Sequence, residues 1–124
     1  MQQLSEESRD ELVRTSRTVV GDELRSVTYF TGDTVEQLYL RADLEAEANL
    51  VGFADTERLG FQSRTDYENT ELGEYQFTIR VFEDGYLTRV IVGDNGVFVT
   101  TDSIVRNRFE ELAAALKGVL RDLA

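Results

Sequence analysis

Residues 75–100, YQFTIRVFEDGYLTRVIVGDNGVFVT, decide the fold of this chain because apolar and polar side chains alternate over 75–81 and two further apolar-rich runs follow at 86–92 and 97–100. Side chains of a β-strand point to the two faces of a sheet in turn, so this alternation is typical of strands with one buried face. An Asp-Gly pair at 84–85 and an Asp-Asn-Gly triplet at 94–96 separate the runs with residues that favour hairpin turns. The stretch therefore predicts an antiparallel meander with strands at 75–81, 86–92 and 97–100.

The N-terminal third of the chain shows a helical pattern followed by a strand pattern. Apolar residues on one face predict a helix over 6–20, and Ser8 with Glu11 matches a capping box. Alternation then predicts strands at 24–30 and 35–40 around a turn. A helix starting at Asp33 is the rival interpretation of the second of these strands.

Two further helices are predicted from apolar residues at helical spacing. One covers 43–59, and Gly60 follows it at the place where a helix end is expected. Residues 62–73 are polar and without period, which indicates the longest loop. Apolar residues from Val105 to Leu123 step by four and three and predict the last helix, capped by one of residues 101–103.

The resulting order is helix-strand-strand-helix-strand-strand-strand-helix. This order predicts a single α+β domain over 1–124, in which three helices pack on the faces of a five-stranded antiparallel sheet. A chain of 124 residues with 41% hydrophobic residues is large enough for one core. In a meander the first strand lies outermost, so we expect the strand within 74–82 at the sheet edge.

The charge of the chain is strongly negative, with 24 acidic against 13 basic residues and a net charge of −11. Lys117 is the only lysine among the basic residues. Two interpretations compete: an acidic protein that repels nucleic acid, or a halophilic protein whose self-repulsion is screened in molar salt, where the Debye length is about 3 Å. We favour the halophilic interpretation and expect no nucleic-acid partner.

The chain holds no long apolar run and does not open on a signal-peptide pattern. We therefore expect a cytoplasmic protein without a membrane anchor.

The residue types present exclude several kinds of catalytic site. Cysteine and histidine are absent, which removes thiolate nucleophiles, imidazole bases and the usual transition-metal ligands. Neither a Gly-x-Ser-x-Gly motif nor a phosphate-binding glycine loop occurs. Pairs of carboxylates such as Glu110 and Glu111 are expected by chance among 24 acids. The sequence thus predicts a protein that is not an enzyme and that uses no cofactor and no metal.

Two arginines of the meander are the candidate site residues. If the Asp-Gly pair alone forms the turn, Glu83 faces Tyr86 and Arg80 lies opposite Arg89. Like charges opposite each other destabilise a sheet, so we expect an acidic group nearby. One source is a carboxylate from a covering helix or loop, such as 62–73. The other is an anionic ligand or an acidic partner surface, since guanidinium groups bind carboxylate and phosphate through two hydrogen bonds.

Four segments carry a resemblance to known proteins: LRSV at 24–27, YFTGD at 29–33, LYLR at 38–41 and GVFVT at 96–100. Through them the sequence resembles a group of small, acidic, uncharacterised haloarchaeal proteins, which implies no activity. The order of elements is also similar to that of roadblock and other profilin-like domains, and to PAS and GAF sensor domains. The likeness to roadblock domains implies a dimeric scaffold for regulatory GTPases or motility systems. The likeness to PAS and GAF domains implies a domain that binds a small ligand.

These observations predict a non-enzymatic regulatory or protein-interaction domain whose partner is a second copy or another protein. The unpaired edge strand and the apolar stripe of the last helix both favour a homodimer. The alternative is a small-molecule sensor, with its ligand between the sheet and the helix at 44–59 or under the loop at 62–73. A third and less favoured class is a metal-dependent hydrolase built on carboxylates, which would require three or more acids in one cleft.

Overall fold

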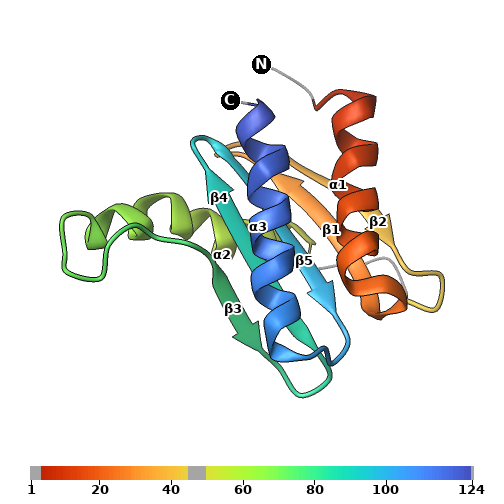
Figure 1. The fold of residues 1–124 in the computed structure, drawn as a ribbon. Helices are drawn as coiled ribbons and strands as arrows, with labels where there is room; N and C mark the ends of the chain where they lie inside the picture. The colour runs from red at the N-terminus through yellow and green to blue at the C-terminus, as the bar shows by residue number, and fades with distance from the viewer. Residues whose placement is uncertain (1–3, 45–49, 124) are drawn as a thin grey trace.

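The computed structural model describes residues 4–44 and 50–123, and these form a five-stranded antiparallel sheet with the strand order β2-β1-β5-β4-β3 (Figure 1). The strands are β1 (Leu24–Phe30), β2 (Val35–Leu40), β3 (Thr78–Val81), β4 (Tyr86–Val92) and β5 (Asn95–Thr101). The helices are α1 (Glu6–Val20), α2 (Leu50–Ser63) and α3 (Arg106–Leu123), with short 3-10 helices η1 (Gly21–Glu23) and η2 (Arg64–Tyr67). The predicted α+β class and the predicted order of elements are confirmed.

The helices cover the two faces of the sheet unequally. Helices α1 and α3 lie side by side on one face, and α2 lies on the other (Figure 1). The larger core cluster lies under α1 and α3 and includes Leu12, Val27, Val97, Val99, Leu112 and Leu116. The smaller cluster lies under α2 and consists of Phe30, Ala54, Leu87, Ile91 and Phe98. The apolar stripe of the last helix is therefore mostly core, as its period indicates.

Helix α1 has the predicted bounds, but its cap is a different residue. The hydroxyl of Ser5 accepts a hydrogen bond from the backbone N–H of Ser8 at 3.1 Å, so Ser5 is the N-cap and the predicted capping box is wrong. The helix starting at Asp33 is also wrong, because residues 35–40 pair with β1 as strand β2.

Helix α2 does not end at Gly60 as predicted, but continues to Ser63. Of the predicted range 43–59, residues 43–44 lie in a turn and residues 45–49 lie outside the described ranges. The glycine is needed for close packing instead: a Cβ at position 60 would lie 2.4 Å from Cζ of Arg89. Gly60 therefore allows the Arg89 guanidinium to approach the helix backbone.

The segment between α2 and β3 is only partly a loop. Its predicted range begins with the last residues of α2 and continues through η2. Strand β3 begins at Thr78, three residues later than predicted. We call residues 64–77 the arm, because they extend away from the sheet (Figure 1).

The β3–β4 hairpin has a four-residue loop rather than the predicted two-residue turn. Val81 pairs with Tyr86, and the N–H of Phe82 donates to the carbonyl of Gly85 at 2.9 Å. This shifts the register by two residues, which preserves the face to which each side chain points.

Helix α3 begins at Arg106, later than the predicted cap at 101–103. Thr101 is the last residue of β5, and the carboxylate of Asp102 accepts hydrogen bonds from Arg25 and Arg41. These residues therefore join the sheet and its ion pairs and do not cap the helix.

Candidate functional site

Strand β3 is an edge strand, as the meander predicts, and within the described residues it pairs only with β4. Its backbone groups alternate between the two sides of the strand. Because the N–H of Phe82 points toward β4, the N–H and C=O groups of Ile79 and Val81 point outward along the edge. The edge therefore presents hydrogen-bonding groups that a further strand could use.

Large apolar side chains surround this edge and are exposed. The exposed fractions are 70% for Val81, 58% for Phe82, 40% for Phe53 and 38% for Ile79. A groove of about 910 Å³ runs between α2 and the β3–β4 hairpin, and Phe53, Val81 and Phe82 line it. We call these four side chains and the outer backbone of β3 the edge surface. Several exposed apolar residues in one place mark an interaction site more often than scattered ones do.

The floor of the groove contains a buried ion network centred on Glu57 of α2. The carboxylate of Glu57, which is 2% exposed, accepts from Nε of Arg80 at 2.8 Å and from Nη1 of Arg89 at 3.1 Å. Arg89 also donates to the hydroxyl of Thr78 at 2.8 Å, and its guanidinium lies 5.7 Å from the ring centre of Tyr75. All the donor and acceptor groups of this network come from α2, β3, β4 and the arm.

The structure brings Arg80 and Arg89 onto one sheet face, as predicted, but not directly opposite each other. Arg80 pairs with Leu87, and Arg89 pairs with Thr78, so the two arginines are diagonal neighbours. The acidic side chain beside them comes from α2 and not from the loop at 62–73. The side chain of Arg89 is 6% exposed, whereas that of Arg80 is 40% exposed and lines the groove. Of the two, Arg80 is the one that a partner can reach.

A second ion network ties the ends of β1, β2 and β5 together. Asp102 accepts from Arg41 at 2.6 Å and from Arg25 at 2.9 Å. The hydrogen bond from Arg41, reinforced by Arg25, holds the pKa of Asp102 below its ordinary value, although partial burial opposes this. Arg41 likewise lowers the pKa of Asp43, and the two carboxylates raise the pKa of Arg41. This network fastens the ends of the three strands together.

Sequence reasoning predicted the edge strand and an acidic partner for the two arginines, but it missed the exposed apolar side chains beside the edge and did not identify Glu57 as that partner. The signal for the edge surface is the pair Val81 and Phe82, since consecutive apolar residues cannot both be buried beneath one face of an edge strand. Among residues 4–44 and 50–123, no three acidic side chains gather closely enough to hold a metal ion. No helix in the same ranges is long and apolar enough to cross a bilayer.

The sequence matches one family model over residues 10–121, which is most of its length. The chain belongs to the family described as domain of unknown function DUF7522. No curated protein sequence matches the chain significantly.

Solved structures with the same fold are similar over nearly the whole length of the chain. A structure described as "MglB with tetrameric arrangement" has a TM-score of 0.67 at 10% identity and covers 98% of this chain and 96% of its own. Gliding protein MglB from Thermus thermophilus has a TM-score of 0.62 at 13% identity, with 98% and 95% covered. A roadblock/LC7 domain from Streptomyces avermitilis has a TM-score of 0.57 at 14% identity, with 89% and 95% covered. At these identities the likeness shows the fold, and it confirms the roadblock-like arrangement expected from the order of elements.

Proposed function

We propose that this chain is a non-enzymatic regulatory domain that acts by protein interaction and associates with a second copy of itself through the edge surface. The observation that carries the proposal is the coincidence of outward backbone groups on β3 with exposed Ile79, Val81 and Phe82. Paired edge strands gain backbone hydrogen bonds, and the flanking side chains lose contact with water at the same time.

A second copy is the partner that this surface suits best. Two antiparallel β3 strands related by a two-fold axis present the same groups to each other, so one surface serves both partners. The fold is also that of a structure described as MglB with a tetrameric arrangement, which supports an assembling domain. The similar solved structures are of MglB and roadblock type, which favours an interaction domain over a small-molecule sensor.

Arg80 is proposed to contact the partner at the rim of this interface. Its guanidinium is half-exposed while Glu57 holds one side of it, so the remaining donors can reach an acidic group on the partner. Arg89 is buried beneath it and is proposed to hold Arg80 and Glu57 in position.

The location and solvent of the domain are part of the proposal. We infer a cytoplasm of high salt content, because 24 acidic residues face 13 basic ones and a single lysine remains. Circular dichroism across a series of KCl concentrations tests this inference. Loss of native structure on dilution of the salt supports it, and an unchanged spectrum and melting temperature at all salt concentrations contradicts it.

The interface is tested by placing a charge on the edge. Val81→Asp puts a carboxylate on the edge surface, and Thr18→Asp puts the same charge on the exposed face of α1 as a matched control. Burying a whole valine side chain contributes about 1.5–3 kcal/mol, so burying the exposed 70% of Val81 in the dimer contributes about 1–2 kcal/mol. A two-fold interface contains Val81 of both copies, so this contribution counts twice. Val81→Asp is therefore expected to weaken the dimer by roughly 30-fold or more.

The readout is the molar mass from light scattering over a range of protein concentrations. The unmodified chain and Thr18→Asp should both reach twice the 14.1 kDa of one chain, and Val81→Asp should remain near 14.1 kDa under the same conditions. The proposal fails if the unmodified chain stays at 14.1 kDa at every concentration. It also fails if Val81→Asp dimerises as strongly as the control.

A further inference from the structure

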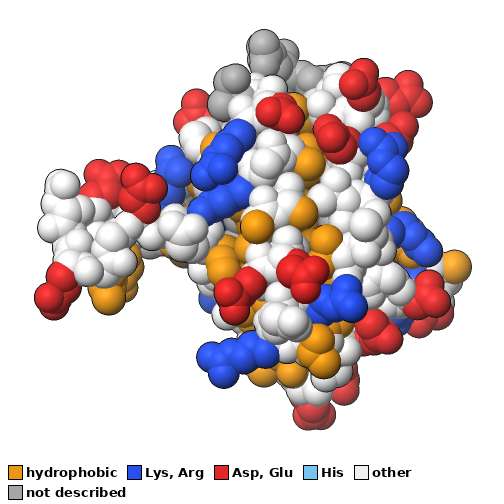
Figure 2. Space-filling view, in the orientation of Figure 1, with side chains coloured by type: hydrophobic (Ala, Val, Ile, Leu, Met, Phe, Trp, Pro, Cys, Tyr) orange, Lys and Arg blue, Asp and Glu red, His pale blue; other side chains and the backbone are white. Residues whose placement is uncertain are grey.

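A second hollow lies between the arm and α3, away from the edge surface. It has a volume of about 580 Å³, and three basic side chains line it: Arg64 from η2, and Lys117 and Arg121 from α3. Figure 2 shows Lys and Arg side chains gathered where the arm meets the upper half of α3. The only lysine of the chain therefore lies in this cleft.

These three cations have no acidic partner among the described residues, where no carboxylate oxygen lies within 4.0 Å of them. Lys117 donates to the side-chain oxygen of Gln76 at 2.7 Å, and Arg64 donates to the carbonyl of Gly93 at 3.0 Å, so both contacts are to neutral groups. The Nε of Arg64 is buried and has no hydrogen-bond partner. In a chain of net charge −11, three positive charges at one place that form no ion pair with a described residue require an explanation.

The electrostatics of the cleft favour a bound anion. Burial lowers the pKa of Lys117, and the positive charge of Arg121 lowers it further, whereas Glu74 acts in the opposite direction. An anion between these groups would relieve their mutual repulsion.

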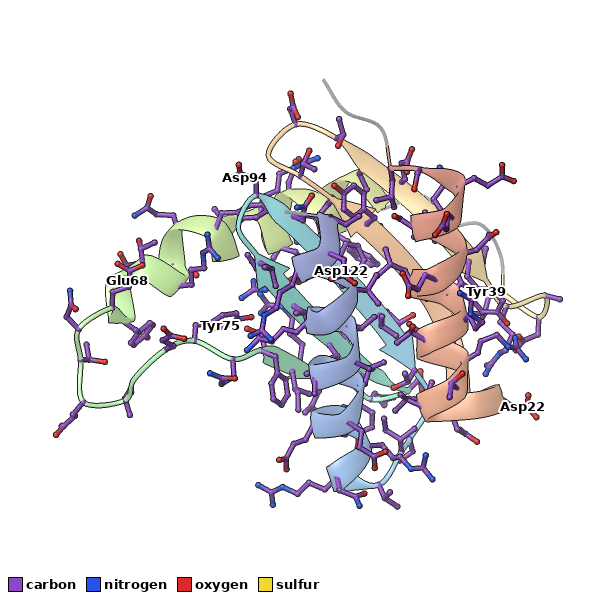
Figure 3. All side chains as sticks on the ribbon, turned by 45° about the horizontal axis from the view of Figure 1, so that its top comes forward. Asp22, Tyr39, Glu68, Tyr75, Asp94 and Asp122 are labelled. Atoms are coloured by element: carbon purple, nitrogen blue, oxygen red, sulfur yellow. The ribbon has the colours of Figure 1, made fainter. Side chains whose placement is uncertain are left out.

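Two acids also line the cleft, but they do not fill this role. These are Glu68 and Glu74. Glu68 lies in the outer part of the arm, and Tyr75, the residue after Glu74, lies nearer the sheet (Figure 3). Neither Glu68 nor Glu74 forms an ion pair with the three cations. Three positive and two negative side chains leave the lining with a net charge of +1, on a protein that is strongly acidic elsewhere.

We propose that this cleft binds the phosphate group of a small organic phosphate, with Arg64, Lys117 and Arg121 as its ligands. A phosphate monoester carries close to two negative charges and three strong acceptor oxygens, which matches three cationic donors better than a single carboxylate does. Tyr75, Ile91 and Val92 supply apolar lining for the organic part. The volume lies within the range of small-molecule sites, which is roughly 300–1,000 Å³.

Because Lys117 is the only lysine of the chain, the rate of its chemical modification reports on the cleft. The protein is treated with an amine-reactive reagent, and the rate of modification of Lys117 is followed by mass spectrometry at the lowest KCl concentration that keeps it folded. Phenyl phosphate is the probe, and phenyl sulfate is the control of the same shape with one negative charge. We expect phenyl phosphate to slow the modification of Lys117 at concentrations where phenyl sulfate does not.

Variants decide whether the protection comes from the cleft. Arg121 is exposed, so Arg121→Gln should fold normally, and it should raise the half-protecting concentration of phenyl phosphate roughly tenfold. Arg121→Lys should retain part of the protection. Arg106→Gln, which removes an exposed arginine at the other end of α3, should leave it unchanged.

Three outcomes overturn the proposal: no protection at millimolar phenyl phosphate, equal protection by phenyl sulfate, or the same loss in Arg106→Gln as in Arg121→Gln. The molar mass of Arg121→Gln by light scattering should equal that of the unmodified chain. This separates failure of the phosphate site from failure of the proposed dimer.

Discussion

Replacing Gly60 by alanine is expected to destabilise this domain, although the same change stabilises most helices. Glycine in a helix interior costs about 0.5–1 kcal/mol relative to alanine, so Gly60→Ala gains that amount from the backbone alone. The added Cβ would lie 2.4 Å from Cζ and 2.5 Å from Nη1 of Arg89, closer than atoms can approach. The guanidinium must therefore move.

The size of the loss follows from what holds that guanidinium. An arginine tip moves easily in solvent, but this one is 6% exposed and bonded to the carboxylate of Glu57 and the hydroxyl of Thr78. Removing one partner of a buried ion pair lowers the free energy of unfolding by about 3–5 kcal/mol. Displacing the guanidinium while it keeps some of its contacts should cost less, about 2–3 kcal/mol. After the helix gain, Gly60→Ala should lower the free energy of unfolding by about 1–2 kcal/mol.

The matched control is Gly118→Ala in α3, where a Cβ meets nothing within 4 Å. This variant should gain about 0.5–1 kcal/mol. Thermal unfolding followed by circular dichroism at one KCl concentration should show Gly60→Ala melting about 4–8 °C lower and Gly118→Ala about 2–4 °C higher than the unmodified chain. If Gly60→Ala is as stable as Gly118→Ala, the guanidinium is not held in place as described, and the reasoning is wrong.

Two further predictions concern the ion networks. Arg89→Gln should cost about 3–5 kcal/mol of unfolding free energy because it leaves the buried carboxylate of Glu57 with one partner. Arg80→Gln should cost about 1–2 kcal/mol because the side chain of Arg80 is 40% exposed. Urea titration measures both losses, and equal losses contradict the difference in burial. The folded-state pKa of Asp102 lies below its ordinary value of 3.8, so its stabilising contribution is complete above that value and is lost as pH falls through the folded pKa. Acid titrations should therefore show a shallower loss of stability below about pH 4 for Asp102→Asn than for the unmodified chain, and parallel curves would show that the network contributes nothing.

Local sequence signals predicted the elements well where a single physical cause determines them. The strands at 24–30 and 86–92 lie between turn signals, and the last helix shows a single apolar stripe after Val105. The edge position of β3 followed from the meander order, because a first strand in a meander has one neighbour. These features depend on residues close to one another in the chain.

The errors arise where a residue serves a distant contact. Gly60 is typical of a helix end, but it accommodates Arg89, which is 29 positions later in the sequence. Asp102 is typical of a helix cap, but it binds Arg25 and Arg41. The predicted hairpin register differs from the observed one because an Asp-Gly pair can belong to either a two-residue or a four-residue loop. The pairing of Glu57 with two arginines depends on how α2 crosses the sheet, which no local pattern records.

The unequal covering of the two sheet faces has a consequence for the motions of this domain. Among the side chains that the structure describes, thirteen buried apolar residues form the core under α1 and α3 and five form the core under α2, which the Glu57 network and hydrogen bonds from Arg58 also hold. Elements with fewer buried contacts open at lower free energy. Backbone amides of α2 should therefore exchange with deuterium before those of β5 and α3, and the partly open state would uncover Phe98 and Leu87 while the rest of the molecule stays native.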